Sequence, residues 1–219
     1  MFKTIIFDLD GTILDTIYDL KEAVNYALKT LNHNERSLEE IREFIGDGLT
    51  NLMLRALGKT EVDEEVKASI RLFTSYYKDH LAVYTKEFEG MKELLIQLKN
   101  EGFKIGVLSN KDDYAVKILC DKFYPGLIDV KRGRTEDGKV KPDHSLVDYM
   151  LEQLETNIAI YVGDSTTDAQ TIIENGLLGI LVDWGYEDYS ELDKYNIQIV
   201  KTMEELKKLI FIKQKFWYL

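Results

Sequence analysis

Short apolar runs alternate along the chain with longer stretches in which apolar residues recur every three or four positions. The short runs are rich in β-branched residues and are bounded by Gly, Asp or Asn, so they predict buried strands, whereas the longer stretches predict amphipathic helices. The predicted strands are residues 3–7, 104–108, 127–131, 159–162, 179–182 and 197–200. Because strand and helix alternate, the pattern predicts an α/β fold with a Rossmann-like, doubly wound parallel sheet covered by helices on both faces.

One long segment interrupts this alternation. Between about Asp15 and Tyr84 no run has the pattern of a strand, and the apolar residues follow helical spacing. We therefore predict a discontinuous catalytic core, residues 1–14 and 85–219, and an inserted all-helical cap domain, residues 15–84. Because two short connections would join the cap to the core, the cap could move as a lid over a site between them.

Composition and charge narrow the possible partners. Hydrophobic residues make up 45% of the chain and charged residues 31%, which is typical of a soluble globular protein. The formal net charge of -11 argues against a broad basic surface, so we expect neither a nucleic-acid polymer nor a membrane as partner. The sequence shows no signal peptide and has a single cysteine, Cys120, which fits a cytoplasmic protein. A monomer and a homodimer both remain open.

Polar residues gather at the carboxyl ends of the predicted strands, where doubly wound sheets bind their ligands. There are four such clusters, and they comprise residues 8–12, 109–111, 141–142 and 163–168. Since the carboxyl ends of parallel strands share one edge of a sheet, each strand is expected to deliver a different chemical group to the same place. The sequence therefore predicts one site built from four distant segments.

The first cluster carries two carboxylates that suit phosphoryl transfer. Asp8 and Asp10 lie two residues apart in an extended segment, so both side chains can face the same side. The Asp8 carboxylate can attack a phosphate ester and form an aspartyl-phosphate, which divides a difficult displacement into two easier ones. Asp10 can protonate the leaving oxygen and later deprotonate the attacking water. Gly11 lets the backbone turn sharply beside the phosphate.

The acidic residues of the first and fourth clusters predict a metal ion. Carboxylates packed at close range raise each other's pKa and resist ionisation, and a hard divalent cation removes this conflict. Magnesium (Mg2+) prefers oxygen ligands and usually binds through one or two carboxylates and the substrate phosphate. We assign it to the side chains of Asp8 and Asp164 and to the main-chain carbonyl of Asp10. Asp168, one helical turn after Asp164, is expected to hold a metal-bound water.

The phosphoryl group also needs hydrogen-bond donors and positive charge on its other oxygens. Ser109 offers a hydroxyl, Asn110 an amide, and Lys141 an ammonium that can bridge Asp8 and the phosphate. Thr12, at the end of the first cluster, is included in the phosphate-binding set. These residues complete the predicted substrate contacts.

Together the four clusters, in this order, resemble the motifs of the haloacid dehalogenase-like (HAD) hydrolase superfamily, and the likeness covers nearly the whole chain. The helical insert resembles the first type of cap in that superfamily, and the chain is similar to its phosphoglycolate phosphatases. The turn formed by Gly46, Asp47 and Gly48 adds to this similarity and is a candidate cap specificity loop. The resemblance implies a magnesium-dependent phosphatase with Asp8 as nucleophile and a small phosphorylated metabolite as substrate, phosphoglycolate being the first candidate.

Several other functions share these motifs. Superfamily members that cleave carbon–halogen bonds lack the second aspartate, so Asp10 favours phosphoryl transfer. A sugar-phosphate mutase similar to β-phosphoglucomutase needs a cationic cap group that faces the site; Arg42 and Arg55 are available, but nothing in the sequence aims them. A pyrophosphatase or a nucleotidase also remains open. A binding or regulatory protein without turnover is disfavoured because the complete motif set is present.

Overall fold

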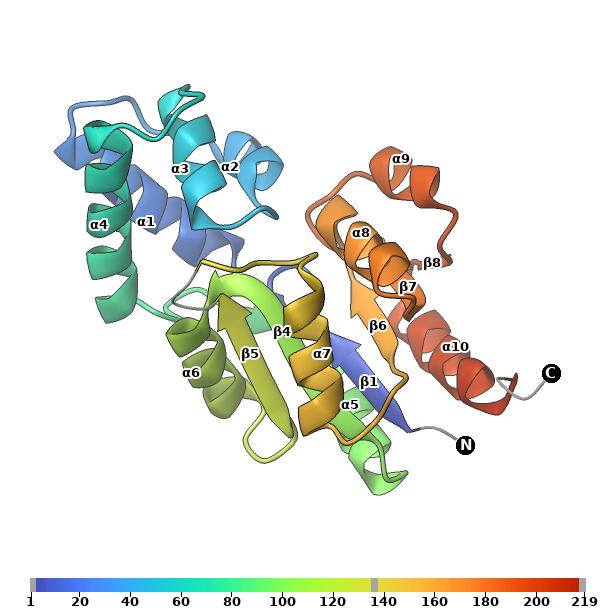
Figure 1. The fold of residues 1–219 in the computed structure, drawn as a ribbon. Helices are drawn as coiled ribbons and strands as arrows, with labels where there is room; N and C mark the ends of the chain where they lie inside the picture. The colour runs from blue at the N-terminus through green and yellow to red at the C-terminus, as the bar shows by residue number, and fades with distance from the viewer. Residues whose placement is uncertain (1–2, 135–137, 217–219) are drawn as a thin grey trace.

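The computed structural model describes residues 3–134 and 138–216, and within them a six-stranded parallel sheet forms the centre of the molecule (Figure 1). The strand order is β5-β4-β1-β6-β7-β8, and each neighbouring pair is parallel. The strands are β1 (Thr4–Phe7), β4 (Lys104–Asp112), β5 (Val130–Arg134), β6 (Ile160–Gly163), β7 (Leu178–Val182) and β8 (Ile199–Val200). The predicted fold class is therefore confirmed.

Two strand boundaries differ from the prediction in ways that matter for the site. β5 begins at Val130 because the apolar residues Leu127 and Ile128 pack into the core as part of a turn, where the Leu127 main-chain nitrogen donates to Tyr124. β4 continues beyond its apolar run to Asp112. This extension carries the polar residues Ser109, Asn110 and Lys111 to the carboxyl edge of the sheet.

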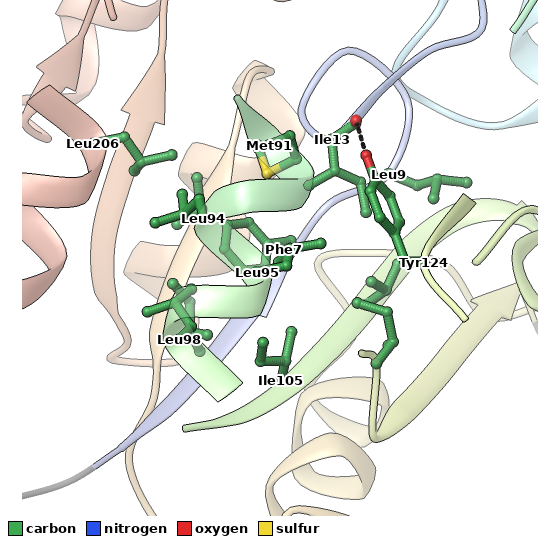
Figure 2. Packing of buried hydrophobic residues seen from close by; sticks show 14 of the residues in the cluster. Phe7, Leu9, Ile13, Met91, Leu94, Leu95, Leu98, Ile105, Tyr124 and Leu206 are labelled. Carbon is green, nitrogen blue, oxygen red and sulfur yellow. Dashed lines mark hydrogen bonds between the residues drawn. The ribbon is translucent and has the colours of Figure 1, made fainter. Parts of the chain in front are cut away.

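Helices cover both faces of the sheet because alternate strand residues point to opposite sides. Ile5 and Phe7 of β1 pack with α5 (Met91–Asn100), α6 (Asp113–Phe123) and α10 (Met203–Phe216), whereas Ile6 packs with α7 (His144–Gln153) and α8 (Thr166–Glu174). Figure 2 shows the apolar packing around Phe7, where the Tyr124 hydroxyl donates to the Ile13 carbonyl at 2.6 Å. A short helix α9 (Tyr189–Leu192) and a 3-10 turn η1 (Asp193–Tyr195) lead into β8.

The inserted segment forms a separate group of helices beyond the end of the sheet (Figure 1). Its helices are α1 (Ile17–Thr30), α2 (Leu38–Phe44), α3 (Leu49–Leu57) and α4 (Glu64–Asp79). They share their own apolar core, to which Leu28, Met53 and Phe73 belong. The local sequence sets the helix ends: Ser37 and Glu40 form a capping box at α2, and the Asp63 side chain caps α4. The exact boundaries at 14/15 and 84/85 stay a prediction.

The two connections between core and insert lie side by side. The short strands β2 (Leu14–Asp15) and β3 (Lys86–Glu87) pair antiparallel. Next to them, the buried Asp19 carboxylate at the start of α1 accepts hydrogen bonds from the Tyr84 and Thr85 main-chain nitrogens at 2.9 and 2.8 Å. One carboxylate thus fastens the second connection to the first helix of the cap. Within the described ranges, no helix is both long and apolar enough to cross a membrane.

Candidate active site

A cavity of about 350 Å³ lies between the carboxyl edge of the sheet and the cap. Six of the site residues predicted in the core line it, and they are Asp8, Asp10, Ser109, Asn110, Lys141 and Asp164. They come from four segments that are far apart in sequence and meet because the parallel strands end at the same edge. Cap side chains from α1 to α4 close the opposite wall.

Asp8 and Lys141 form the floor of the cavity, and Asp168 lies behind them, in contact with Lys141. The Lys141 ammonium lies 2.7 Å from Asp8 Oδ1 and 2.7 Å from Asp168 Oδ1. Burial raises the pKa of Asp8 to about 7, with smaller contributions from Asp168 and Asp10 and an opposing one from Lys141. Burial alone would lower the pKa of Lys141, but the carboxylates of Asp168 and Asp8 outweigh it and raise that pKa well above the ordinary value. Lys141 therefore stays charged.

Protein donors surround the Asp168 carboxylate. Oδ1 accepts from Lys141 Nζ and from the Tyr161 hydroxyl, and Oδ2 accepts from the Asp164 and Ser165 main-chain nitrogens and from Ser165 Oγ. Ser165 Oγ in turn accepts from the Asp168 nitrogen, which completes a capping box at the start of α8. This fully buried side chain therefore holds Lys141 in position, and its contact with a metal-bound water stays a prediction.

Asp164 is held rigidly beside Asp8. Its Oδ1 accepts from Thr12 Oγ1 at 2.7 Å, and its Oδ2 accepts from the Tyr186 main-chain nitrogen at 2.9 Å. A side chain at Gly11, where φ is +84°, or at Gly185 would overlap the Asp164 carboxylate, so both glycines allow its close approach. Burial raises the pKa of Asp164, and the neighbouring carboxylates of Asp8 and Asp168 add to the effect.

Thr12 was included in the phosphate-binding set, and the structure gives its hydroxyl a different partner. Thr12 is fully buried, does not line the cavity, and donates its hydroxyl proton to Asp164. The backbone turns at Gly11, where φ is +84°, so the extended segment ends before Thr12. The Thr12 hydroxyl therefore orients the Asp164 carboxylate, and a contact between Thr12 and the phosphate stays a prediction.

The acidic cluster fits a hard divalent cation. Single oxygens of Asp8, Asp164 and Asp168 lie within 4.8 Å of one another, and all three residues are buried. Lys141 balances only part of this charge, and buried carboxylates without a counter-charge are costly. Since protein donors occupy Asp168, the side chains of Asp8 and Asp164 are the ones that could hold the ion. The contribution of the Asp10 carbonyl stays a prediction.

Lys111 is a site residue that the sequence analysis left without a role. Its ammonium lies 2.9 and 3.0 Å from the two carboxylate oxygens of Asp10, and Thr16 Oγ1 donates to Asp10 Oδ1 at 2.5 Å. Burial opposes the charge of Lys111, but Asp10 outweighs burial and raises the pKa of Lys111. The sequence could have indicated this position, because Ser109 and Lys111 are two residues apart in one strand and strand periodicity places them on the same side.

The predicted cap loop touches the core at two points. The Asn110 side-chain nitrogen donates to the Gly46 carbonyl at 3.2 Å, and Thr167 Oγ1 donates to Asp47 Oδ1 at 3.0 Å. Asn110 Oδ1 also accepts from the Lys141 main-chain nitrogen at 2.6 Å. Gly46 and Gly48 line the cavity, whereas Asp47 does not. The loop therefore closes over the site, and its part in specificity stays a prediction.

The two cap arginines considered for a mutase have different surroundings. Arg55 pairs with Asp47 and donates to the Phe44 carbonyl, so it braces the cap loop. Arg42 lines the cavity together with its neighbours Glu39 and Glu43. The structure therefore directs only Arg42 of this pair toward the site.

Tyr186 links Asp164 to the cap connection and had no signal in the sequence. Its hydroxyl accepts from the main-chain nitrogens of Thr16 and Ile17 at 2.7 and 3.1 Å and lies 3.2 Å from Asp15 Oδ1. Its own main-chain nitrogen donates to Asp164. One residue in the loop after β7 thus contacts both the carboxylate cluster and the start of α1.

Comparison with known proteins agrees with this geometry. Residues 5–181 match the family model for haloacid dehalogenase-like hydrolases. The chain belongs to the haloacid dehalogenase-like hydrolase family. It is 33% identical over 187 residues to a phosphoglycolate phosphatase of Aquifex aeolicus (strain VF5), covering 84% of this chain and 86% of that protein. It is also 30% identical to the phosphoglycolate phosphatase of Nitrosospira multiformis, with 95% of each chain covered.

Solved structures of the HAD-like family give the same result. A predicted phosphoglycolate phosphatase from Haemophilus somnus 129pt superimposes with a TM-score of 0.86 at 26% identity, covering 95% of this chain and 98% of that one. The family and the enzyme class predicted from the sequence, a HAD-type phosphatase, are thereby confirmed.

Proposed function

We propose that this HAD-like hydrolase is a magnesium-dependent phosphatase that cleaves a small phosphate monoester through an aspartyl-phosphate on Asp8. The observation that carries the proposal is the placement of Asp8 on the cavity floor, 2.7 Å from the buried Lys141 ammonium, with Asp10 beside it. A nucleophilic carboxylate, a second carboxylate for proton transfer and a fixed cation are the groups that a two-step phosphoryl transfer requires.

In the first step Asp8 attacks phosphorus, the ester P–O bond breaks, and Asp10 gives a proton to the leaving oxygen. In the second step Asp10 takes a proton from water as that water attacks the phosphorus of the aspartyl-phosphate and frees Asp8. Lys141 and the Ser109 hydroxyl stabilise charge on the phosphoryl oxygens during both steps. Lys111 and Thr16 fix the Asp10 carboxylate in place through their hydrogen bonds.

Bound to Asp8 and Asp164, Mg2+ would supply the positive charge that an anionic substrate needs in this acidic site. The buried carboxylate cluster supports this assignment because Lys141 offsets only part of its charge. Thr12 and the Tyr186 main-chain nitrogen would keep Asp164 in the required orientation.

Phosphoglycolate is the substrate we propose first, because relatives that align over most of the chain are phosphoglycolate phosphatases. A second candidate is a sugar-phosphate mutase, favoured by one observation, the presence of Arg42 in the cavity wall. The proposed partner is thus a small phosphorylated metabolite. A cytoplasmic location and a monomeric or homodimeric state stay predictions.

A phosphate-release screen tests the proposal. Phosphoglycolate, glucose phosphates, nucleoside monophosphates, pyrophosphate and an aryl phosphate are compared with Mg2+ and after chelation. We expect phosphoglycolate to be hydrolysed fastest, and activity to disappear on chelation and return with Mg2+. Isomerisation of a glucose phosphate without phosphate release would instead favour the mutase.

The nucleophile is tested by Asp8→Asn, with Asp148→Asn on the exposed face of α7 as the matched control. We expect Asp8→Asn to lower turnover by orders of magnitude while the control retains it, because only Asp8 can form the covalent intermediate. Aryl phosphate hydrolysis at the wild-type rate in Asp8→Asn would refute the assignment.

A further inference from the structure

Tyr77 on α4 places a buried hydroxyl in the cavity wall. The residue is only 6% exposed, its ring stacks on Phe73 with 5.3 Å between centroids, and it lines the cavity. Among the described residues, no hydrogen bond of good geometry reaches its hydroxyl oxygen, although the Lys111 ammonium lies close to it. Buried polar groups in folded proteins are normally hydrogen-bonded, so an unpaired hydroxyl beside a cavity indicates a partner that occupies the cavity.

Lys111 places a positive charge next to this hydroxyl. Its ammonium lies 5.0 Å from the centroid of the Tyr77 ring, and it hydrogen-bonds to Asp10. Tyr77 therefore lies close to the carboxylate that handles the leaving oxygen. Burial raises the pKa of Tyr77 to about 12, so the phenol keeps its proton and can donate. An ammonium and a phenol that face the same space are a donor pair suited to an anionic oxygen.

The rest of the cavity does not favour an anion in the same way. Leu20, Leu52 and Phe73 make part of the cap wall apolar. In the part of the cavity formed by α2, Arg42 carries one positive charge, but Glu39 and Glu43 line the same part and outnumber it. A carboxylate would be repelled by the two glutamates and would be poorly solvated against the leucines. The donor pair of Lys111 and Tyr77 is the better place for it.

We infer that Tyr77 Oη and Lys111 Nζ bind a carboxylate on the carbon that bears the phosphate ester, which makes the substrate class phosphate esters of 2-hydroxy acids. The inference rests on the proposed function and names what the cap recognises. In such an ester only two bonds separate the carboxylate carbon from the ester oxygen. The carboxylate must then lie next to Asp10, where Lys111 and Tyr77 are found.

The experiment compares phosphoglycolate with ethyl phosphate, which has a methyl group where phosphoglycolate has its carboxylate. The kcat and KM of both esters are measured with the full-length protein and Mg2+, for the wild type and for Tyr77→Phe. The matched control is Tyr76→Phe, the same change at the neighbouring residue of α4, whose ring stacks on Tyr26 and does not line the cavity.

We expect Tyr77→Phe to lower the ratio of kcat/KM for phosphoglycolate to that for ethyl phosphate by about tenfold to a hundredfold, the effect of one hydrogen bond to a charged group. Most of the change should lie in the KM for phosphoglycolate. Tyr76→Phe should leave the ratio as it is in the wild type. Without ligand, the melting temperature of Tyr77→Phe should fall little, since Lys111 keeps its ion pair with Asp10 when the hydroxyl is removed.

An unchanged ratio in Tyr77→Phe, or an equal loss for both esters, would overturn the inference, because the hydroxyl would then serve the fold or bind only water. An equal fall of the ratio in Tyr76→Phe would overturn it as well. Failure of the proposed function gives a different result: the wild type would release phosphate from neither ester, nor from the aryl phosphate, in the presence of Mg2+. A wild type that cleaves the aryl phosphate and ethyl phosphate but not phosphoglycolate would overturn the inference alone.

Discussion

Replacement of Lys141 tests whether its positive charge compensates the buried carboxylates of Asp8 and Asp168. Replacing it by methionine keeps an unbranched side chain one atom shorter, but removes the only positive charge within 2.7 Å of both Asp8 and Asp168 in the described part of the chain. All three residues are at most 6% exposed, so water cannot take over the role of the ammonium. Removing one partner of such a buried pair costs about 3–5 kcal/mol, because a charge is left uncompensated.

The effect should be visible in thermal unfolding without metal at pH 7.5. For a protein of this size each kcal/mol lowers the melting temperature by about 2–4 °C, so Lys141→Met should melt about 6–20 °C below the wild type. Lys131→Met is the matched control, because Lys131 pairs with the exposed Asp121 on the surface. That pair should be worth less than about 1 kcal/mol.

A double variant separates charge from packing. If the loss in Lys141→Met comes from uncompensated carboxylates, adding Asp8→Asn should restore part of the stability, since one of the two charges is then gone. The reasoning would be refuted if Lys141→Met were no less stable than Lys131→Met. It would also be refuted if the double variant were no more stable than Lys141→Met alone.

Two further predictions concern the metal site. In the metal-free protein the pKa of Asp8, about 7, exceeds the value of about 3.9 expected in the unfolded chain, so the folded state binds the extra proton between these values. The stability of the metal-free protein should therefore fall as pH rises from about 4 to 7. Mg2+ should raise the melting temperature more at pH 8 than at pH 5, because the ion binds the deprotonated carboxylate. An increase in melting temperature that does not depend on pH would contradict this. Gly185→Ala should raise the Mg2+ concentration needed for half-maximal activity at least tenfold, because the new methyl group displaces Asp164. The control Gly58→Ala, a change at φ +66° in open space, should lower stability without changing the Mg2+ requirement.

The sequence was most informative where one physical rule connects distant segments. Apolar runs locate the strands, and parallel strands end at one edge, so the meeting of Asp8, Ser109, Lys141 and Asp164 could be predicted from four short motifs. The partner of Thr12 could not be predicted in the same way, because alternation holds only while the backbone stays extended and the chain turns at Gly11.

Other parts of the site depend on tertiary packing that no local pattern records. Tyr77 reaches the cavity from the cap helix α4. Tyr186 lies 170 positions after Thr16 in the sequence, yet its hydroxyl contacts the cap connection. Neither has a motif around it. The same holds for the pairing of Lys111 with Asp10 across 101 positions, although strand periodicity did indicate the side on which Lys111 lies.

Asn110 connects the chemistry of the core to the position of the cap through a single amide group. Its oxygen accepts from the Lys141 nitrogen, while its nitrogen donates to Gly46 of the cap loop. Of these two bonds, only the one to Gly46 joins the core to the cap, so a movement of the cap loop would leave the bond to Lys141 intact. An aspartate at this position would still accept from Lys141 but would repel the Gly46 carbonyl. A single amide-to-carboxylate change would thus weaken the contact between the cap loop and the core without disturbing the segment that carries Lys141.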